Sequence, residues 1–127
     1  MSTVRADNYA NRLGTSSIPV DTLLQGSAKA TFNLNGTGTI AARDSFNVSS
    51  FVDNGVGDYT ANWSVAMPNA NYVPVGMATQ NPPSAVVNVT SKFSVPPVVN
   101  SFNAISTQAT ATVDIAFIYV TVHGDPV

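Results

Sequence analysis

Apolar and polar residues alternate with a period of two along much of this 127-residue chain. The alternation is clearest over residues 28–34 and 59–65, where every second side chain is apolar. Successive side chains of a β-strand point to opposite faces, so this pattern predicts strands with one buried face. The residues expected in the core are Ala28, Ala30, Phe32, Leu34, Tyr59, Ala61, Trp63 and Val65.

Two turn-forming stretches punctuate this alternation, NGTG at 35–38 and DNGVGD at 53–58. Asn and Gly tolerate positive φ, which favours hairpin tips at Asn35-Gly36 and Asn54-Gly55. A calcium loop of the EF-hand type closes with a Glu, and a phosphate-binding loop needs a Gly-Lys pair. The chain contains neither. We interpret DNGVGD as a turn, with an adventitious cation site as the weaker alternative.

The strongest predicted strand is ATVDIAFIYVTVHG, residues 111–124, which is apolar on both faces. A strand that is covered on both faces is central in a sandwich, or has one face in a subunit interface. We favour an interface between copies of the chain. The alternative is that the facing sheet and residues 1–27 cover both faces within one chain. The residues expected at the interface are Ile115, Phe117, Ile118, Tyr119 and Val120.

Residues 1–27 lack a regular period, and Gly14, Pro19 and Gly26 interrupt any helix. An extended N-terminal arm is expected here, which lies along its own domain or along a neighbouring subunit. Residues 28–127 are expected to form one all-β domain, an antiparallel β-sandwich or jelly-roll-like fold of about seven or eight strands.

Charged residues make up only 9% of the chain, against about 25% in typical proteins, and Glu is absent. The net charge is −2 with no basic stripe, which argues against nucleic-acid binding. No apolar run reaches the length that a membrane-spanning helix needs. A surface this poor in charge is better suited to a protein that is covered by neighbouring subunits than to a lone monomer.

The sequence offers little for catalysis. His123 is the only histidine, and it stands beside Asp125 near the end of the last predicted strand. No nucleophile motif of the GxSxG type accompanies it, and Cys is absent. Trp63 and the tyrosines could stack on sugars, but Trp63 alternates in phase with core positions. We expect no enzymatic activity, no cofactor and no metal.

Four motifs stand out within residues 26–76: Phe32 to Thr39, Asn47 to Ser50, Asp53 to Thr60 and Met67 to Tyr72. With them, this run resembles a segment of short tail-fibre and other virion proteins of tailed bacteriophages, especially marine and cyanobacterial ones. The resemblance covers about 100 positions in all, including the leader before Val20 and the ending near His123. It departs at Thr31, where relatives tend to carry Trp, and across 79–110.

The resemblance implies a β-rich, trimeric part of the phage particle, made in the bacterial host cytoplasm and without enzymatic activity. Two roles stay open: a tail-fibre or adhesin module held on the particle by residues 1–27, and a capsid decoration protein that stabilises the head. A carbohydrate-binding domain is an alternative of another class. For an adhesin, the expected contacts with a host glycan or protein lie in two proline-rich loops, at Gln80, Asn81, Pro82, Pro83, Pro96 and Pro97.

Overall fold

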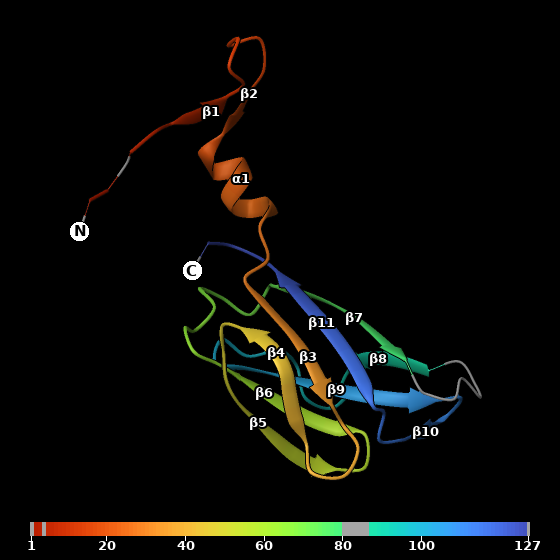
Figure 1. Ribbon diagram of the computed structural model, residues 1–127. Helices are drawn as coiled ribbons and strands as arrows, with labels where there is room; N and C mark the ends of the chain where they lie inside the picture. Colours follow the sequence, from red (N-terminus) through yellow and green to blue (C-terminus); the bar gives the residue numbers. More distant parts are fainter. Residues whose placement is uncertain (1, 4, 80–86, 127) are drawn as a thin grey trace.

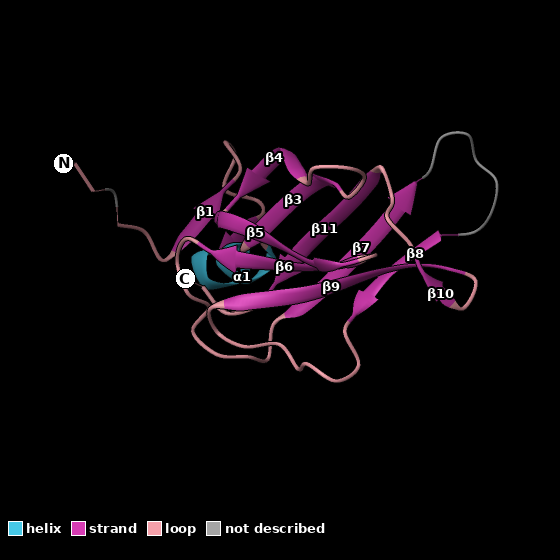
Figure 2. Cartoon of the chain, turned by 90° about the horizontal axis from the view of Figure 1, so that it is seen from below, coloured by secondary structure: helices cyan, strands magenta, loops and turns pink. Residues whose placement is uncertain are grey.

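The computed structural model describes residues 2–3, 5–79 and 87–126, which form two packed antiparallel sheets and a projecting N-terminal segment (Figure 1). Strands predominate among these residues, and the helix that they contain is short. The expectation of an all-β chain built from antiparallel sheets is therefore confirmed. Figure 2 shows the two sheets as separate layers, with β3, β4, β7 and β11 in one and β5, β6, β8 and β9 in the other.

The first sheet, called the β11 sheet below, has the strand order β4-β3-β11-β7. Its central strand is the C-terminal strand, which pairs with β3 from Ile118↔Leu34 to Val122↔Ala30 and with β7 along its whole length. The sheet is made of β3 (Ala30–Asn35), β4 (Ala41–Phe46), β7 (Val73–Thr79) and β11 (Phe117–His123).

The second sheet, called the β9 sheet, has β9 at its centre with β6 and then β5 on one side. β8 pairs with the other side of β9 from Val87↔Gln108 to Ser91↔Ala104. The short β10 pairs with the end of β9. The strands are β5 (Val48–Gly55), β6 (Asp58–Trp63), β8 (Val87–Ser91), β9 (Ser101–Gln108) and β10 (Ala111–Thr112).

The core lies between the two sheets and uses the alternate positions that the sequence predicted in β3 and β6. Phe32 meets Phe51 edge to face, with ring centroids 5.2 Å apart. Trp63 is buried against Tyr72, which confirms it as a core residue. Val65 was expected in the core but is exposed, because β6 ends at Trp63. The buried apolar residues are Ala30, Phe32, Leu34, Tyr59, Ala61, Trp63, Met67, Tyr72, Phe102, Ala104, Ile115, Ile118, Val120 and Val122.

Both predicted hairpins are present. Asn35 pairs with Ala41 across the tip that joins β3 to β4, and Gly55 pairs with Asp58 across the tip that joins β5 to β6. The second turn residue, Gly57, has φ +66°. Each hairpin stays within one sheet, β3–β4 in the β11 sheet and β5–β6 in the β9 sheet. The domain is therefore an antiparallel sandwich in which each of these two hairpins belongs to one sheet.

Asn47 makes the corner at which the chain passes from the β11 sheet to the β9 sheet. It follows the last residue of β4 and has φ +56°, a conformation that Asn tolerates better than most residues. Its side-chain amide donates to the carbonyls of Lys29 and Val65, and its Oδ1 accepts from the amide N–H of Val65 at 2.7 Å. One side chain thus ties three segments together at this edge.

The N-terminal segment differs from the extended arm that the sequence suggested. It contains a small hairpin, β1 (Asn8–Ala10) and β2 (Ser17–Pro19), and a helix, α1 (Val20–Gly26). Pro19 does not interrupt this helix but precedes its first residue, where its fixed φ of −58° is compatible with helix entry. Figure 1 shows the segment projecting from the end of the sandwich near the C-terminus.

Candidate functional site

The outer face of the β11 sheet exposes a row of apolar side chains. Because Thr121 pairs with Val75, and Tyr119 with Met77, the odd-numbered residues of β7 and β11 point away from the core together. Val73, Val75 and Met77 are exposed, Met77 at 66% of its surface, and Tyr119 lies beside them. Neither strand contains Asp, Glu, Lys or Arg. This surface is called the apolar face below.

Arg43 and Phe117 lie beside the apolar face, on the side nearest β4. The guanidinium of Arg43 lies 4.1 Å from the centroid of the Phe117 ring, and its Nη1 donates to the carbonyl of Ala116. The rings of Phe117 and Tyr119 stack at 6.4 Å. A guanidinium over an aromatic face is a favourable contact, and here it leaves Phe117 half-buried. Phe46, on the same strand as Arg43, is exposed.

A shallow groove of about 240 Å³ runs along the apolar face. Val75 and Met77 line it from β7, Tyr119 and Thr121 from β11, and Thr31 from β3. Its lining is mainly apolar, with threonine hydroxyl groups as the polar exceptions. A groove of this kind suits an apolar side chain or a small secondary-structure element better than a charged ligand.

The predicted interface residues on the last strand are divided between the two faces. Ile115, Ile118 and Val120 are buried in the core of the single chain, Ile118 with no exposed surface, so assigning them to an interface was wrong. Phe117 and Tyr119 lie on the outer face. Sequence analysis missed Val73, Val75 and Met77, although their alternation around Pro74 and Gly76 was a usable signal.

Only part of the predicted host-contact region can be placed. Gln80, Asn81, Pro82 and Pro83 lie outside the described residues. Pro96 and Pro97 lie in the connection between β8 and β9. Val98 of that connection accepts a hydrogen bond from the Tyr72 hydroxyl, and Tyr72 also lies against Gly124 just after β11. Pro96 and Pro97 therefore lie at the end of the sandwich that carries the N-terminal segment, which argues against a host-binding tip opposite that segment.

The outer face of the β9 sheet is polar and hydrogen-bonded within itself. Asn54 donates to Thr60 and Asp58, and Asn103 donates to the same Thr60 hydroxyl at 2.9 Å. Asp58 forms an ion pair with Lys92 at 2.5 Å. The DNGVGD stretch is thus a hairpin tip whose side chains satisfy one another. Among the described residues, no group of three or more His, Cys, Asp or Glu could hold a metal ion.

A polar contact at one end of the sandwich involves a glycine from each of the two hairpins. Oδ1 of Asp114 lies 2.9 Å from the Tyr59 hydroxyl and accepts from the N–H of Gly57 at 2.8 Å. The same hydroxyl lies 2.9 Å from the carbonyl oxygen of Gly36. Burial, followed by the neighbouring Asp114, raises the pKa of the Tyr59 hydroxyl. This group joins both hairpins to the loop before β11 and is structural.

His123 lies in a polar hollow of about 310 Å³ at the junction with α1. Asp125 in this hollow accepts from Asn69 at 2.6 Å and from Gln25 at 3.3 Å. The imidazole Nε2 of His123 has the Thr121 hydroxyl as its neighbour, at 3.4 Å. The Asp125 carboxylate is thus engaged by amides. The arrangement ties the N-terminal segment to the end of β11.

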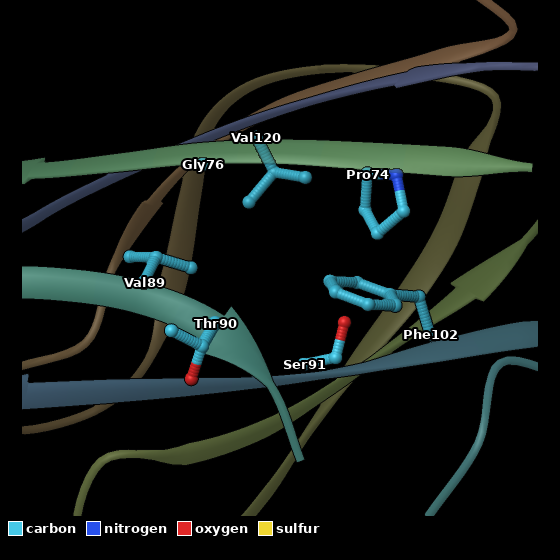
Figure 3. Close-up of a pocket in the computed structure, with 7 residues that line it drawn as sticks. All are labelled: Pro74, Gly76, Val89, Thr90, Ser91, Phe102 and Val120. Carbon is cyan, nitrogen blue, oxygen red and sulfur yellow. The ribbon is translucent and has the colours of Figure 1, made fainter. Parts of the chain in front are cut away.

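A small cavity lies between β7 and β8, where the two sheets meet without pairing (Figure 3). Its volume is about 20 Å³, enough for roughly one water molecule. Val89 and Phe102 line it, and the Ser91 hydroxyl points toward it in Figure 3. The cavity is too small for a ligand and marks a packing gap at the edge of the core.

Comparison with known proteins finds no match: no family model, no curated protein and no solved structure matches the chain. The described residues contain no helix that is long and apolar enough to cross a membrane. The apolar face lies on the outside of the β11 sheet. It is the structural feature that bears most directly on function.

Proposed function

We propose that this protein is a structural subunit of a bacteriophage particle and that it acts by associating with copies of itself, as a homotrimer. The observation that carries the proposal is the uncharged apolar face of β7 and β11, which the single chain leaves open to solvent. Monomeric proteins rarely leave such a contiguous patch exposed, and closed symmetric association covers it. The resemblance of residues 26–76 to phage virion proteins supplies the biological setting.

The fold supports a binding role over a catalytic one. The two hairpin tips that carry the virion-like motifs serve to build the sandwich, and His123 lies in a junction with the N-terminal segment. The virion-like run 26–76 and the sandwich fit a tail-fibre or adhesin module, which we favour. They also fit a capsid decoration protein. In both roles residues 1–27 attach the domain to a neighbour on the particle.

Light scattering coupled to size-exclusion chromatography tests self-association. The expected mass is three times that of the chain, which is 13.2 kDa. A monomer at micromolar concentration would rule the proposal out. Immunogold labelling of phage particles then distinguishes the two roles, because gold at the tail supports the adhesin and gold on the head supports the decoration protein. Particles without any label would contradict both.

A carbohydrate-binding role is the second candidate, and one observation favours it. Phe93 is fully exposed directly after Lys92, at the edge of the polar face of the β9 sheet. An exposed ring beside amide and carboxylate groups is a combination that sugar-binding proteins use. Binding to a glycan array that is lost in Phe93→Ala would support this role. A monomeric protein that binds glycans would favour it over the assembly proposal.

A further inference from the structure

The N-terminal segment, residues 5–27, is folded but contains no buried residue. Every residue in it is exposed except Val20, which is half-buried. Its strands have three residues each and its helix has seven. Isolated hairpins and helices of this size are marginal in water, because their own contacts do not offset the loss of chain entropy. A fold of this kind needs another surface to pack against.

The sandwich of the same chain does not supply that surface. The segment is held only near the C-terminal end of α1, where the Lys29 ammonium donates to the carbonyls of Leu24 and Ser27 and Gln25 donates to Asp125. Beyond this attachment the segment points away from the sandwich (Figure 1). Its large apolar side chains all stay exposed: Tyr9, Leu13, Ile18, Leu23 and Leu24.

The apolar face lacks an element that covers it, whereas the N-terminal segment lacks a surface to pack against. It carries a groove between β7, β11 and β3, and a groove is filled by a convex element such as a helix or a hairpin. Two copies of the same hollow surface do not fill each other. Neither β7 nor β11 carries a charge that would have to be desolvated, and the only charged residue between Ser16 and Gln25 is Asp21.

We infer that residues 5–27 of one copy pack on the apolar face of a second copy, with Leu23, Leu24 and Ile18 against Val75, Met77 and Tyr119. The inference rests on the proposed self-association and specifies which two surfaces meet when copies of the chain associate. The contact is heterologous, since two different surfaces meet, so it closes into a ring when the rotation between copies allows. The junction at Lys29 fixes the direction in which each segment leaves its own domain.

Single-cysteine variants test the contact directly, because the native chain has no Cys. L23C and M77C chains with different tags are mixed, allowed to exchange subunits, and treated with a short bismaleimide. The inference expects the mixed L23C–M77C product to dominate, with little product from either variant alone. If M77C chains cross-link mainly to one another, the apolar faces pack on each other and the inference is wrong.

Charge substitutions in the full-length chain provide the second test. Leu23→Asp and Met77→Asp place a carboxylate on opposite sides of the same contact, so each is expected to shift the mass to that of one chain. Both positions are exposed in the monomer, so far-UV circular dichroism is expected to stay unchanged. Val52→Asp, on the exposed outer side of β5, is the matched control and is expected to assemble normally.

The outcomes separate this inference from the proposal on which it rests. If the wild type assembles and Met77→Asp dissociates it while Leu23→Asp does not, self-association stands and the N-terminal segment is not its partner. If both variants retain the wild-type mass, the inference is overturned and the interface lies elsewhere. A wild-type monomer overturns the inference and the proposed self-association together.

Discussion

The hydroxyl of Tyr59 lies 2.9 Å from Oδ1 of Asp114, 55 residues away in the sequence. The same hydroxyl is 2.9 Å from the carbonyl oxygen of Gly36, so one proton serves two acceptors. Asp114 also accepts from the backbone of Gly57. Tyr59 stands at the start of β6 with its ring buried in the core and its hydroxyl at the end of the sandwich. These hydrogen bonds therefore fix the positions of the two hairpins and of the loop before β11 relative to one another.

Replacement of Tyr59 by Phe is expected to destabilise the domain by about 1–3 kcal/mol, because it removes the donor and leaves the Gly36 carbonyl without this partner. The ring and its packing stay in place. Urea unfolding followed by tryptophan fluorescence of Trp63 measures the change. Tyr9→Phe, at an exposed position of β1, is the control and is expected to stay within about 0.5 kcal/mol of wild type. Equal effects of the two substitutions would contradict the structural role of Tyr59.

The raised pKa of Tyr59 predicts a loss of stability in alkali. Folding raises the pKa of this hydroxyl above its ordinary value of 10.0, so the unfolded chain loses the proton first as the pH rises. The contribution of this pKa difference to the free energy of unfolding is fully present below about pH 10 and falls progressively above it. Tyr72, whose pKa burial also raises, adds to the same trend. Unfolding free energies measured from about pH 8 to about pH 11 should fall less steeply in Tyr59→Phe than in wild type. Parallel curves would contradict the assignment.

Gly36 is expected to tolerate no side chain. A Cβ at this position would lie 2.9 Å from the carbonyl oxygen of Ile115 and closer still to the Tyr59 hydroxyl. Because one of these neighbours is backbone, the clash cannot be relieved by a rotamer change, and we expect Gly36→Ala to cost about 1–3 kcal/mol. Gly26→Ala is the matched control, since nothing lies within 4 Å of its Cβ position and its φ is ordinary. Thermal unfolding of both variants gives the comparison.

The alternation in β3 and β6 predicted core residues such as Phe32 and Trp63 correctly, because a half-buried strand shows which of its faces is apolar. The last strand could not be interpreted in this way. Ile118 and Tyr119 are both apolar enough for a core, and only the pairing of β11 with β3 and β7 determines which one points inward. The pairing with β3 joins residues more than 80 positions apart, such as Val120 and Phe32, and local periodicity carries no information about it.

Adjacent substitutions on β11 separate the two faces experimentally. Ile118→Asp places an unpaired charge in the core and is expected to destabilise the chain by about 3–5 kcal/mol, which would unfold a domain of ordinary stability. Tyr119→Asp places the same charge on the apolar face, so the domain should stay folded and lose self-association. Circular dichroism and light scattering on both variants distinguish these results. A folded Ile118→Asp monomer would mean that the core assignment of Ile118 is wrong.

The helix in the N-terminal segment was missed although its signals are present. Pro19 precedes its first residue, Asp21 lies in its first turn and Gly26 is its last residue, an order that is typical of a short helix. As breakers of a longer helical pattern, Pro19 and Gly26 instead favour an extended arm. The role of Lys29 could not be predicted at all. Its place in an alternating strand indicated an exposed side chain, whereas the helix end folds back over it and buries it.

Lys29 is expected to fix the N-terminal segment to the sandwich, and Lys29→Met tests this with the side chain's length largely kept. The buried ammonium donates to the carbonyls of Leu24 and Ser27 and to the Ser27 hydroxyl, which satisfies groups left free at the end of α1. Without it, amide hydrogen exchange in residues 20–27 should become about tenfold faster, the equivalent of about 1.4 kcal/mol of local stability. Exchange in β6 and β9 should change much less, since their hydrogen bonds lie elsewhere. Lys92→Met, which breaks only the ion pair with Asp58 on the opposite sheet, is the control and should leave α1 unaffected. Unchanged exchange in α1 of Lys29→Met would show that the segment is held by other contacts.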